Sequence, residues 1–252
     1  MVIELLILLW LDFYVVFLYK KNICSMIKIF LLCILAILAL SLPNQRPIIG
    51  IYTQVNEDDP PRGESDEIFQ TFISASYIKF VEMSGAQVVP IFAYSNQSEI
   101  AAQLPKLNGV LFPGGDLDFD IKNRWTSNAN FIFQWAMQEN DKGRVFPIWG
   151  TCMGHQLLGY LTCNGVTPLS PVRGEQSIIN SIKFITGDKG YVFEGLSDKL
   201  INKLTTGQGV TYYNHEEAIL MSTYNTNKKL SDFWKVTAET TSSYNEKFVA
   251  VW

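Results

Sequence analysis

Short apolar runs alternate with helical patterns from Arg46 to Cys163. The apolar runs that are typical of buried strands are residues 47–54, 86–92, 108–112 and 145–149. Between them, apolar residues recur at helical spacing from Phe69 to Val81, with Gly85 as the stop, and further helices are expected at 97–104 and 128–140. This alternation predicts an α/β fold with a parallel sheet and helices on both of its faces.

The part of the chain after Cys163 is less regular. Apolar and β-branched residues predict strands at 177–185, 217–221, 233–238 and 248–252. A loop is expected at 56–66, where acids, Pro and Gly are concentrated. No linker or internal repeat interrupts the pattern, so we expect a single domain over residues 46–252.

The N-terminal segment, residues 1–41, reads as a leader rather than as part of this domain. It holds two apolar runs, Val2–Tyr19 and Ile29–Leu40, with lysines between them. The second run has the basic approach, apolar centre and small-residue exit of a secretory signal, so we expect a signal peptide at 26–41 and an upstream extension at 1–25. The alternative is a protein anchored in the membrane by these runs. A signal peptide predicts a secreted or lumenal protein.

Charge and cysteine content narrow the function classes. The whole chain has 20 Lys and Arg residues and 24 Asp and Glu residues. The leader contains three of the basic residues and two of the acidic ones, so 17 basic and 22 acidic residues remain outside it. This balance argues against nucleic acid as a partner, because no basic stripe remains to neutralise phosphates. Outside the leader only Cys152 and Cys163 remain. If one helix joins them they lie about 16 Å apart, too far for a disulfide.

A single thiol stands at the most informative turn of the chain. The run from Phe146 to Trp149 leads into Gly150-Thr151-Cys152-Met153-Gly154, which has the spacing of a nucleophile elbow between a buried strand and a helix. The two glycines avoid a collision where strand and helix cross, while the residue at the turn is forced into a strained conformation. The start of the helix favours a thiolate there. Cys152 is therefore the candidate nucleophile.

Four ordered motifs, including this elbow, resemble γ-glutamyl hydrolases, which are class I glutamine-amidotransferase-like cysteine hydrolases. The motifs are Arg46-Pro47-Ile48-Ile49-Gly50-Ile51, Tyr77–Glu82 with Gly85–Pro90, Asn108–Gly115 and Trp149–Gly154. The resemblance implies a flavodoxin-like fold and an omega peptidase that hydrolyses folate poly-γ-glutamates in a lysosome, a vacuole or the extracellular space. The substrate would be a small molecule, folyl-poly-γ-glutamate. We expect no metal and no cofactor, and we consider a homodimer.

Attack on a γ-carbonyl generates an oxyanion that needs preorganised hydrogen-bond donors. The backbone N–H of Met153, next to the nucleophile, is one candidate. The Pro113-Gly114-Gly115 turn at the end of the strand at 108–112 offers two more, because glycines let the main chain approach the carbonyl oxygen closely. We therefore expect an oxyanion hole built from the amides of Gly114, Gly115 and Met153.

The chain has two histidines, and their roles differ. His155 follows Cys152 on the same helix and is expected to be packed, because the elbow aims the sulfur away from that helix. Tyr213-Asn214-His215 matches a segment of the family whose His contacts substrate, so His215 is predicted to bind substrate. A catalytic base and a structural role are the alternatives for His215.

The resemblance also leads us to expect a base from a His-Pro-Glu motif directly after a strand such as 248–252. The sequence stops at Trp252, so we expect the domain to be C-terminally incomplete. If translation ends there, a catalytically dead γ-glutamyl-binding protein is one alternative function. The other is a glutaminase subunit of an amidotransferase, because Gly154-His155-Gln156 is common in such domains. In both alternatives, the protein would still bind a γ-glutamyl group.

Overall fold

The computed structural model describes residues 28–34, 46–55, 71–185, 190–206 and 210–252. The chain divides into two compact units, residues 1–46 and 47–252. In the first unit, residues 28–34 form a short exposed helix, and the remainder of the predicted leader lies outside the described residues. Within the part of the chain that the structure describes, no helix is both long enough and apolar enough to cross a membrane.

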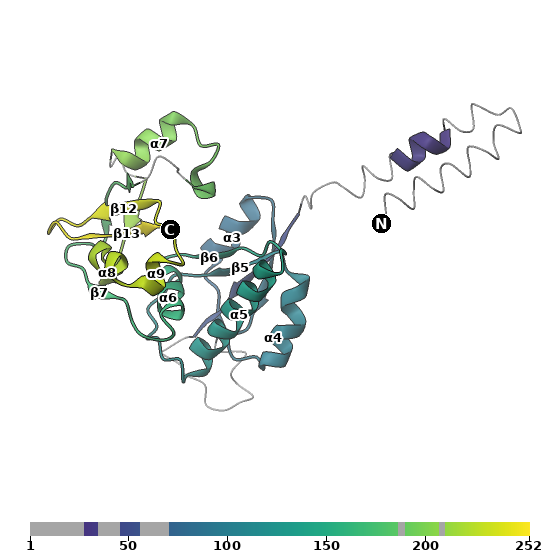
Figure 1. Cartoon of the computed structure of the whole chain (residues 1–252), viewed down its shortest axis with the longest axis horizontal. Helices are drawn as coiled ribbons and strands as arrows, with labels where there is room; N and C mark the ends of the chain where they lie inside the picture. Colours follow the sequence, from purple (N-terminus) through teal and green to yellow (C-terminus); the bar gives the residue numbers. More distant parts are fainter. Residues whose placement is uncertain (1–27, 35–45, 56–70, 186–189, 207–209) are drawn as a thin grey trace, which may run out of the picture. The chain divides into compact units, whose positions relative to one another are not determined.

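The second unit contains the predicted parallel sheet (Figure 1). Its strands are β1 (Ile48–Tyr52), β4 (Gln87–Ile91), β5 (Gly109–Phe112) and β6 (Ile148–Gly150). They lie in the order β4-β1-β5-β6, and each neighbouring pair is parallel. The first strand therefore lies inside the sheet and the chain reverses direction across it, which is the order of flavodoxin-like doubly wound folds. The predicted α/β fold class is confirmed.

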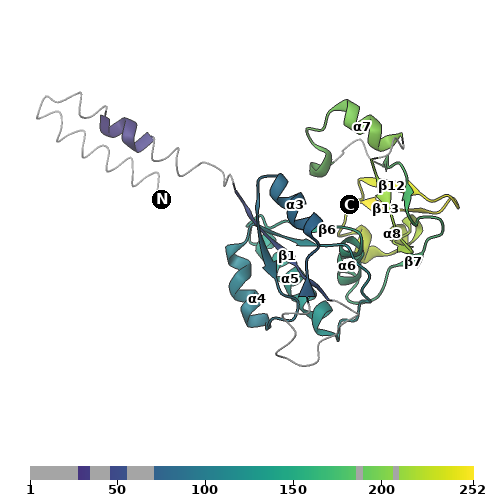
Figure 2. The same cartoon turned by 180° about the vertical axis from the view of Figure 1, so that it is seen from behind.

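Helices cover both faces of this sheet, as Figure 1 and Figure 2 show from opposite sides. The helix α3 (Ala75–Met83) packs with Ile51 and Leu111 on one face. On the other face α4 (Gln97–Gln103), α5 (Arg124–Asp141) and α6 (Met153–Thr162) enclose a larger core. Neighbouring strand residues point to opposite faces, so Tyr52 and Phe112 belong to the larger core while Ile51 and Leu111 belong to the smaller one.

Two predicted boundaries in this half were wrong. The helical pattern that began at Phe69 overran a strand, because β3 (Thr71–Phe72) pairs with β2 (Gln54–Val55) and the helix begins only at Ala75. The strand predicted at 145–149 is shorter and shifted, since Val145 is 84% exposed and pairing begins at Ile148. Phe69 and the loop predicted at 56–66 lie outside the described residues.

The remainder of the unit is built from small antiparallel sheets. Its strands are β7 (Ser170–Pro171), β8 (Ile178–Ile179), β9 (Lys183–Phe184), β10 (Tyr212–Tyr213), β11 (Glu217–Ala218), β12 (Ala238–Thr241) and β13 (Lys247–Val251). Its helices are the 3₁₀ turn η3 (Tyr191–Phe193), α7 (Asp198–Thr205), α8 (Met221–Thr226) and α9 (Lys228–Ser231). The pairs are β10 with β8 and β11 with β7, and the order β13-β12-β9 forms a third sheet.

Three strand predictions in this half need correction. The strand expected at 177–185 is two short strands, because Asn180 between them bonds the backbone of Thr211 and Thr241. The strand expected at 217–221 stops at Ala218, and α8 begins at Met221. The prediction at 233–238 was wrong: residues 233 and 234 close a turn on Leu230, and the strand begins at residue 238. The strand at 248–252 is confirmed as β13.

Candidate active site

The predicted nucleophile elbow is present at the end of β6. Cys152 is the N-cap of α6 and has φ 55° and ψ −117°, a left-handed conformation that a residue with a side chain adopts only under constraint. A Cβ on Gly150 would lie 2.5 Å from the carbonyl oxygen of Gly154, and a Cβ on Gly154 would collide with the carbonyl of Phe112. The two glycines are therefore required by the strand–helix crossing, as the sequence predicted.

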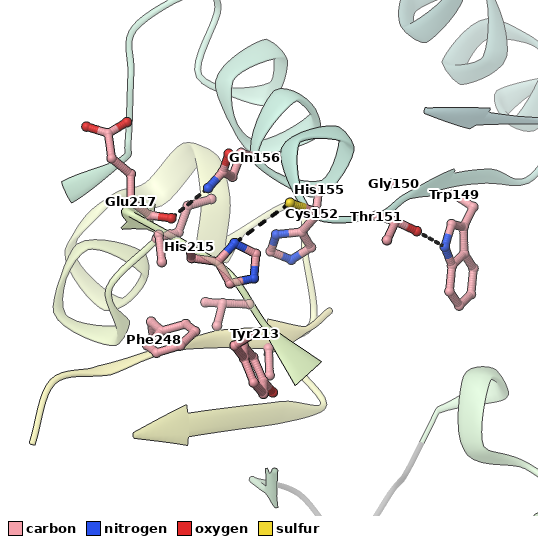
Figure 3. Close-up of a pocket in the computed structure, with 14 residues that line it drawn as sticks. Trp149, Gly150, Thr151, Cys152, His155, Gln156, Tyr213, His215, Glu217 and Phe248 are labelled. Atoms are coloured by element: carbon pink, nitrogen blue, oxygen red, sulfur yellow. Dashed lines mark hydrogen bonds between the residues drawn. The ribbon is translucent and has the colours of Figure 1, made fainter. Parts of the chain in front are cut away.

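His215 lies beside the sulfur (Figure 3). Its Nδ1 is 3.9 Å from Sγ of Cys152, although 63 residues separate the two along the chain. The backbone N–H of His215 donates to the carbonyl of Glu175 at 2.8 Å, and its ring packs edge-on against Tyr213. Burial lowers the pKa of His215, so the imidazole is neutral at neutral pH and can accept the thiol proton.

A hydrogen bond fastens the elbow helix to the loop region that carries His215. Nε2 of Gln156, one turn into α6, donates to the carbonyl oxygen of Glu217 at 2.6 Å. Because α6 also carries Cys152 at its start, this bond ties the strand that follows His215 to the helix of the nucleophile. Gln156 therefore helps to set the separation between sulfur and imidazole.

The three predicted oxyanion donors have different surroundings. The amide of Gly114 already donates to the hydroxyl of Tyr77 at 2.8 Å, and Gln54 bonds the carbonyl of Gly114. The amides of Gly115 and Met153 have no acceptor among the described residues. A Cβ on Gly115 would touch the end of the Met153 side chain, which places the two residues next to each other. These two amides are the donors available to a bound oxyanion.

Tyr77 is a residue of the site that the sequence pattern did not reveal, because it falls within an apolar helical pattern. It lies on α3, and its hydroxyl reaches the glycine turn beside the elbow. Burial raises the pKa of Tyr77, and the neighbouring Cys152 raises it further, so the hydroxyl keeps its proton. Tyr77 lies in the first turns of α3, the helix that connects β1 to β4, and this position was the available signal, because such helices begin near the carboxyl edge of a parallel sheet.

His155 is packed, as expected. Its ring stacks on Trp252 with the centroids 4.2 Å apart, and Trp252 in turn stacks on Trp234 at 4.9 Å. Its Nε2 is shielded from solvent and has no hydrogen-bond partner in the described structure. Burial first, and the proximity of His215 second, lower the pKa of His155 to about 4. His155 is thus a neutral ring in the wall of the site.

Cys152, His155 and His215 line a cavity of about 200 Å³. Cys152 and His215 face it, and strands β11 and β13 close its other side through Glu217–Ile219 and Phe248–Ala250. The cavity therefore brings together a thiol and a neutral imidazole, and Met153, one of the two residues with unengaged amides, directly follows Cys152 in the chain. These are the parts that acyl transfer through a covalent intermediate requires.

The chain is similar in sequence to several known proteins. Residues 47–165 match the family model for peptidase C26. The chain is 29% identical over 231 residues to γ-glutamyl hydrolase B of Dictyostelium discoideum, covering 90% of this chain and 65% of that protein. It is 30% identical to the γ-glutamyl hydrolase of Rattus norvegicus, with coverage of 81% and 62%, and 29% identical to γ-glutamyl hydrolase 1 of Arabidopsis thaliana, with coverage of 77% and 54%.

The chain thus spans less than two thirds of the length of these relatives. Among solved structures, a candidate GMP synthase component from Thermoplasma acidophilum matches with a TM-score of 0.46 and 13% identity, over 82% of this chain and 80% of that one. The family model covers the parallel sheet and the elbow, and the relatives extend the match over most of the chain. The chain belongs to the peptidase C26 family, the family of the γ-glutamyl hydrolases.

Proposed function

We propose that this protein hydrolyses γ-glutamyl isopeptide bonds through Cys152 and that its substrates are folate poly-γ-glutamates. The observation that carries the proposal is the 3.9 Å separation between Sγ of Cys152 and Nδ1 of His215 at a strained elbow. Similarity to γ-glutamyl hydrolases over most of the chain supports the choice of the γ-glutamyl bond.

The reaction begins with a proton transfer. In the tautomer with hydrogen on Nε2, neutral His215 accepts the thiol proton of Cys152 at Nδ1. The thiolate attacks the γ-carbonyl carbon, and the electron pair of the carbonyl moves to its oxygen. The amides of Gly115 and Met153 stabilise that oxyanion. Collapse of the intermediate breaks the C–N bond, and the imidazolium returns its proton to the leaving amine.

Water completes the cycle. It attacks the thioester that joins the γ-glutamyl group to Cys152, and His215 accepts a proton from this water. The second tetrahedral intermediate collapses to release the γ-carboxylate, and Sγ regains its proton from the imidazolium. His155 takes no part in these proton transfers. Burial keeps its ring neutral, and the ring is stacked on Trp252.

The test compares two cysteines of the same chain. Cys152→Ala is expected to lower the hydrolysis of folate pentaglutamate by at least about 10³-fold, because the covalent route is lost. Cys163→Ala is the matched control, since Cys163 is also a free thiol but is buried in a separate core cluster. Products are measured by chromatography. Equal activity of the Cys152→Ala variant and the unaltered chain would exclude the mechanism.

A second function is favoured by one feature. Gly154-His155-Gln156 follows the elbow, as in many glutaminase domains, and Gln156 holds the loop region beside the site. Glutamine is itself a γ-glutamyl amide, so the same residues would release ammonia from it. Ammonia release from glutamine without cleavage of polyglutamates would favour a glutaminase subunit. Binding of polyglutamates with no turnover, and with no labelling of the thiol by a γ-glutamyl electrophile, would favour a γ-glutamyl-binding protein.

We also propose that the protein enters the secretory route and acts in a lumen or outside the cell. The support is the apolar run at 29–40 with its basic approach and small-residue exit. Expression with a C-terminal tag and N-terminal sequencing of the mature product tests this. Cleavage near Ser41 is expected, whereas an intact N-terminus in a membrane fraction would point to an anchor.

A further inference from the structure

The peptide group between Gly114 and Gly115 lies directly beside the nucleophile. A Cβ on Gly114 would be 2.9 Å from Cβ of Cys152. A Cβ on Gly115 would be 3.2 Å from Cε of Met153, the next residue of the elbow. In a planar trans peptide the C=O and the N–H point in opposite directions. This group can therefore turn either its N–H or its carbonyl oxygen toward a bound substrate, but not both.

The two orientations of this peptide group have opposite effects on the proposed reaction. When the N–H of Gly115 faces the substrate, it stabilises the oxyanion. When the carbonyl oxygen of Gly114 faces it instead, two negative oxygens meet and the oxyanion is destabilised. The backbone alone does not decide between them, because glycine adopts the dihedral angles of both orientations without steric cost. A further contact has to select the orientation.

Gln54 makes that contact. Its Nε2 donates a hydrogen bond to the carbonyl oxygen of Gly114. This oxygen is thereby directed at Gln54, and the N–H of Gly115 points the other way. A Cβ on Gly115 would collide with the side-chain amide of Gln54, so the glycine leaves the space that the glutamine occupies. The preceding peptide group is held separately, because the N–H of Gly114 donates to the hydroxyl of Tyr77.

Gln54 is itself firmly placed. It is only 5% exposed and directly follows Thr53. The N–H of Thr53 donates to the carbonyl of Ile91 at 3.0 Å, and its hydroxyl accepts from the N–H of Ala93 at 2.9 Å. Nε1 of Trp125 donates to the carbonyl of Thr53 at 3.0 Å. A flip of the glycine peptide would take the acceptor away from a buried side-chain amide, which costs free energy and opposes the flip.

We propose that Gln54 is a positioning residue that locks the Gly114–Gly115 peptide with the N–H of Gly115 available to the oxyanion. This inference rests on the proposed function and adds a residue that acts through the glycine turn. Because the oxyanion forms only during the reaction, Gln54 acts on the transition state and not on the binding of substrate.

The variant Gln54→Met tests this, because methionine has a similar length and no donor. We expect kcat for folate pentaglutamate to fall about tenfold with KM nearly unchanged, which is less than the about 10²- to 10³-fold cost of losing a whole oxyanion donor. Gln103→Met is the matched control: Nε2 of Gln103 also donates to a backbone carbonyl, that of Pro90 at 2.8 Å, but Gln103 does not line the cysteine cavity. An unchanged kcat, or a raised KM alone, would overturn the proposal.

A second measurement needs no turnover, and its probe is N-acetylglutamate γ-semialdehyde. Sγ of Cys152 bonds to the aldehyde carbon, the thiol proton passes to His215, and the carbonyl electron pair moves to the oxygen. Gln54→Met is expected to weaken this probe about tenfold. Alkylation of Cys152 by iodoacetamide, in which no oxyanion forms, should keep its rate when followed by mass spectrometry of the peptide. Equal affinity for the aldehyde contradicts the proposal, and so does an equal loss in both measurements, which would show that Gln54 supports the elbow as a whole.

The variant Gln54→Glu provides a signature in the pH profile. Its carboxyl group can donate to the carbonyl of Gly114 only when it is protonated, and burial raises the pKa of such a group. The ratio of its kcat to that of the unaltered chain should therefore rise at least about threefold as the pH falls from about 7.5 to about 5. The same ratio for Gln54→Met should stay flat. A flat ratio for both variants would mean a merely structural role for Gln54 and would contradict the proposal.

Failure of this inference can be distinguished from failure of the proposed function. If the unaltered chain and Gln54→Met cleave folate pentaglutamate equally fast, the inference fails and γ-glutamyl hydrolysis stands. If the unaltered chain cleaves no polyglutamate, the proposed function fails. In that case the affinities of the two proteins for the aldehyde still decide whether Gln54 positions the amide of Gly115.

Discussion

The two halves of the compact unit are built differently, although each contributes one partner to the Cys152–His215 pair. In the first half, strands of three to five residues form one parallel sheet between two layers of helices. In the second half most strands have two residues, and α7 and α8 bury no side chain. The nucleophile is therefore held by a large core, whereas the imidazole depends on a thinner structure.

The position of Cys152 is less sensitive to substitution than the position of His215. The elbow is determined by a steric crossing at Gly150 and Gly154 and leaves little freedom. The position of His215 depends instead on single bonds: its own amide to Glu175 and the side chain of Gln156 to Glu217. Catalysis through both residues requires the second half to keep its packing against the first. We expect substitutions in the two halves to differ accordingly.

The largest effect is expected from the imidazole. His215→Ala should lower kcat for γ-glutamyl hydrolysis by about 10²- to 10⁴-fold, because the thiol and the leaving amine lose their proton-transfer partner. His155→Phe is the control on the other histidine. Steady-state kinetics across pH provide the measurement. A rise in KM with kcat unchanged would show that His215 only contacts substrate, which is the role the sequence favoured.

The elbow should respond to a single methyl group. Gly154→Ala is expected to lower the free energy of unfolding by about 3 kcal/mol, because its Cβ meets the backbone of Phe112, which cannot yield as a flexible side chain would. Gly143→Ala is the comparison: it has φ +85° but open space around it, so only about 1 kcal/mol of backbone strain is expected. Urea denaturation measures both. Equal losses of unfolding free energy in the two variants would show that there is room for a methyl group where β6 and α6 cross.

Acidification should destabilise the protein through His155. The pKa of this imidazole is about 4 in the folded state and near 6.5 in the unfolded chain, so protonation favours unfolding as the pH falls from 6.5 to 4. About 2–3 kcal/mol of stability is expected to be lost over that window. His155→Phe keeps a ring against Trp252 and should remove this part of the pH dependence. The free energy of unfolding of the unaltered chain and of His155→Phe is measured across this pH range. Parallel curves for the two proteins would contradict the lowered pKa of His155.

The smallest effect is expected at the glycine turn. Tyr77→Phe removes the acceptor of the Gly114 amide, which should lower the free energy of unfolding by about 1 kcal/mol. Tyr191→Phe is the control, because Tyr191 is 94% exposed. Urea denaturation of the two variants is the test. An effect no larger than that of the control would mean that the Gly114 amide finds another partner when the hydroxyl is absent.

Much of the first half could be predicted, because its elements are long enough to show their own period. The strand β5 (Gly109–Phe112) is buried on both faces, so it appears as a continuous apolar run. The second half has strands too short for an alternating pattern, and residues 233–234 were mistaken for a strand because aromatic residues also favour strands. The ring of Phe233 instead packs against Phe133 and Trp234, and Trp234 stacks on Trp252.

The candidate site divides in the same way. Cys152 was recognisable because the elbow is a local motif whose glycines and thiol lie within five residues. Tyr77 and Gln54 were not, because their hydrogen bonds to Gly114 join segments 37 and 60 residues apart. The sequence around Tyr77 does not indicate that its hydroxyl will accept a hydrogen bond from Gly114.

The α/β alternation, the strained turn at Cys152 and the two glycines around it follow from the order of residues alone, because each depends on neighbours along the chain. The tertiary structure decided which histidine stands beside the sulfur, which amides remain unengaged and which side chain holds the glycine turn. Those features arise where segments far apart in the chain pack together. Packing across distant segments follows from the shape and chemistry of whole surfaces, which no local pattern records.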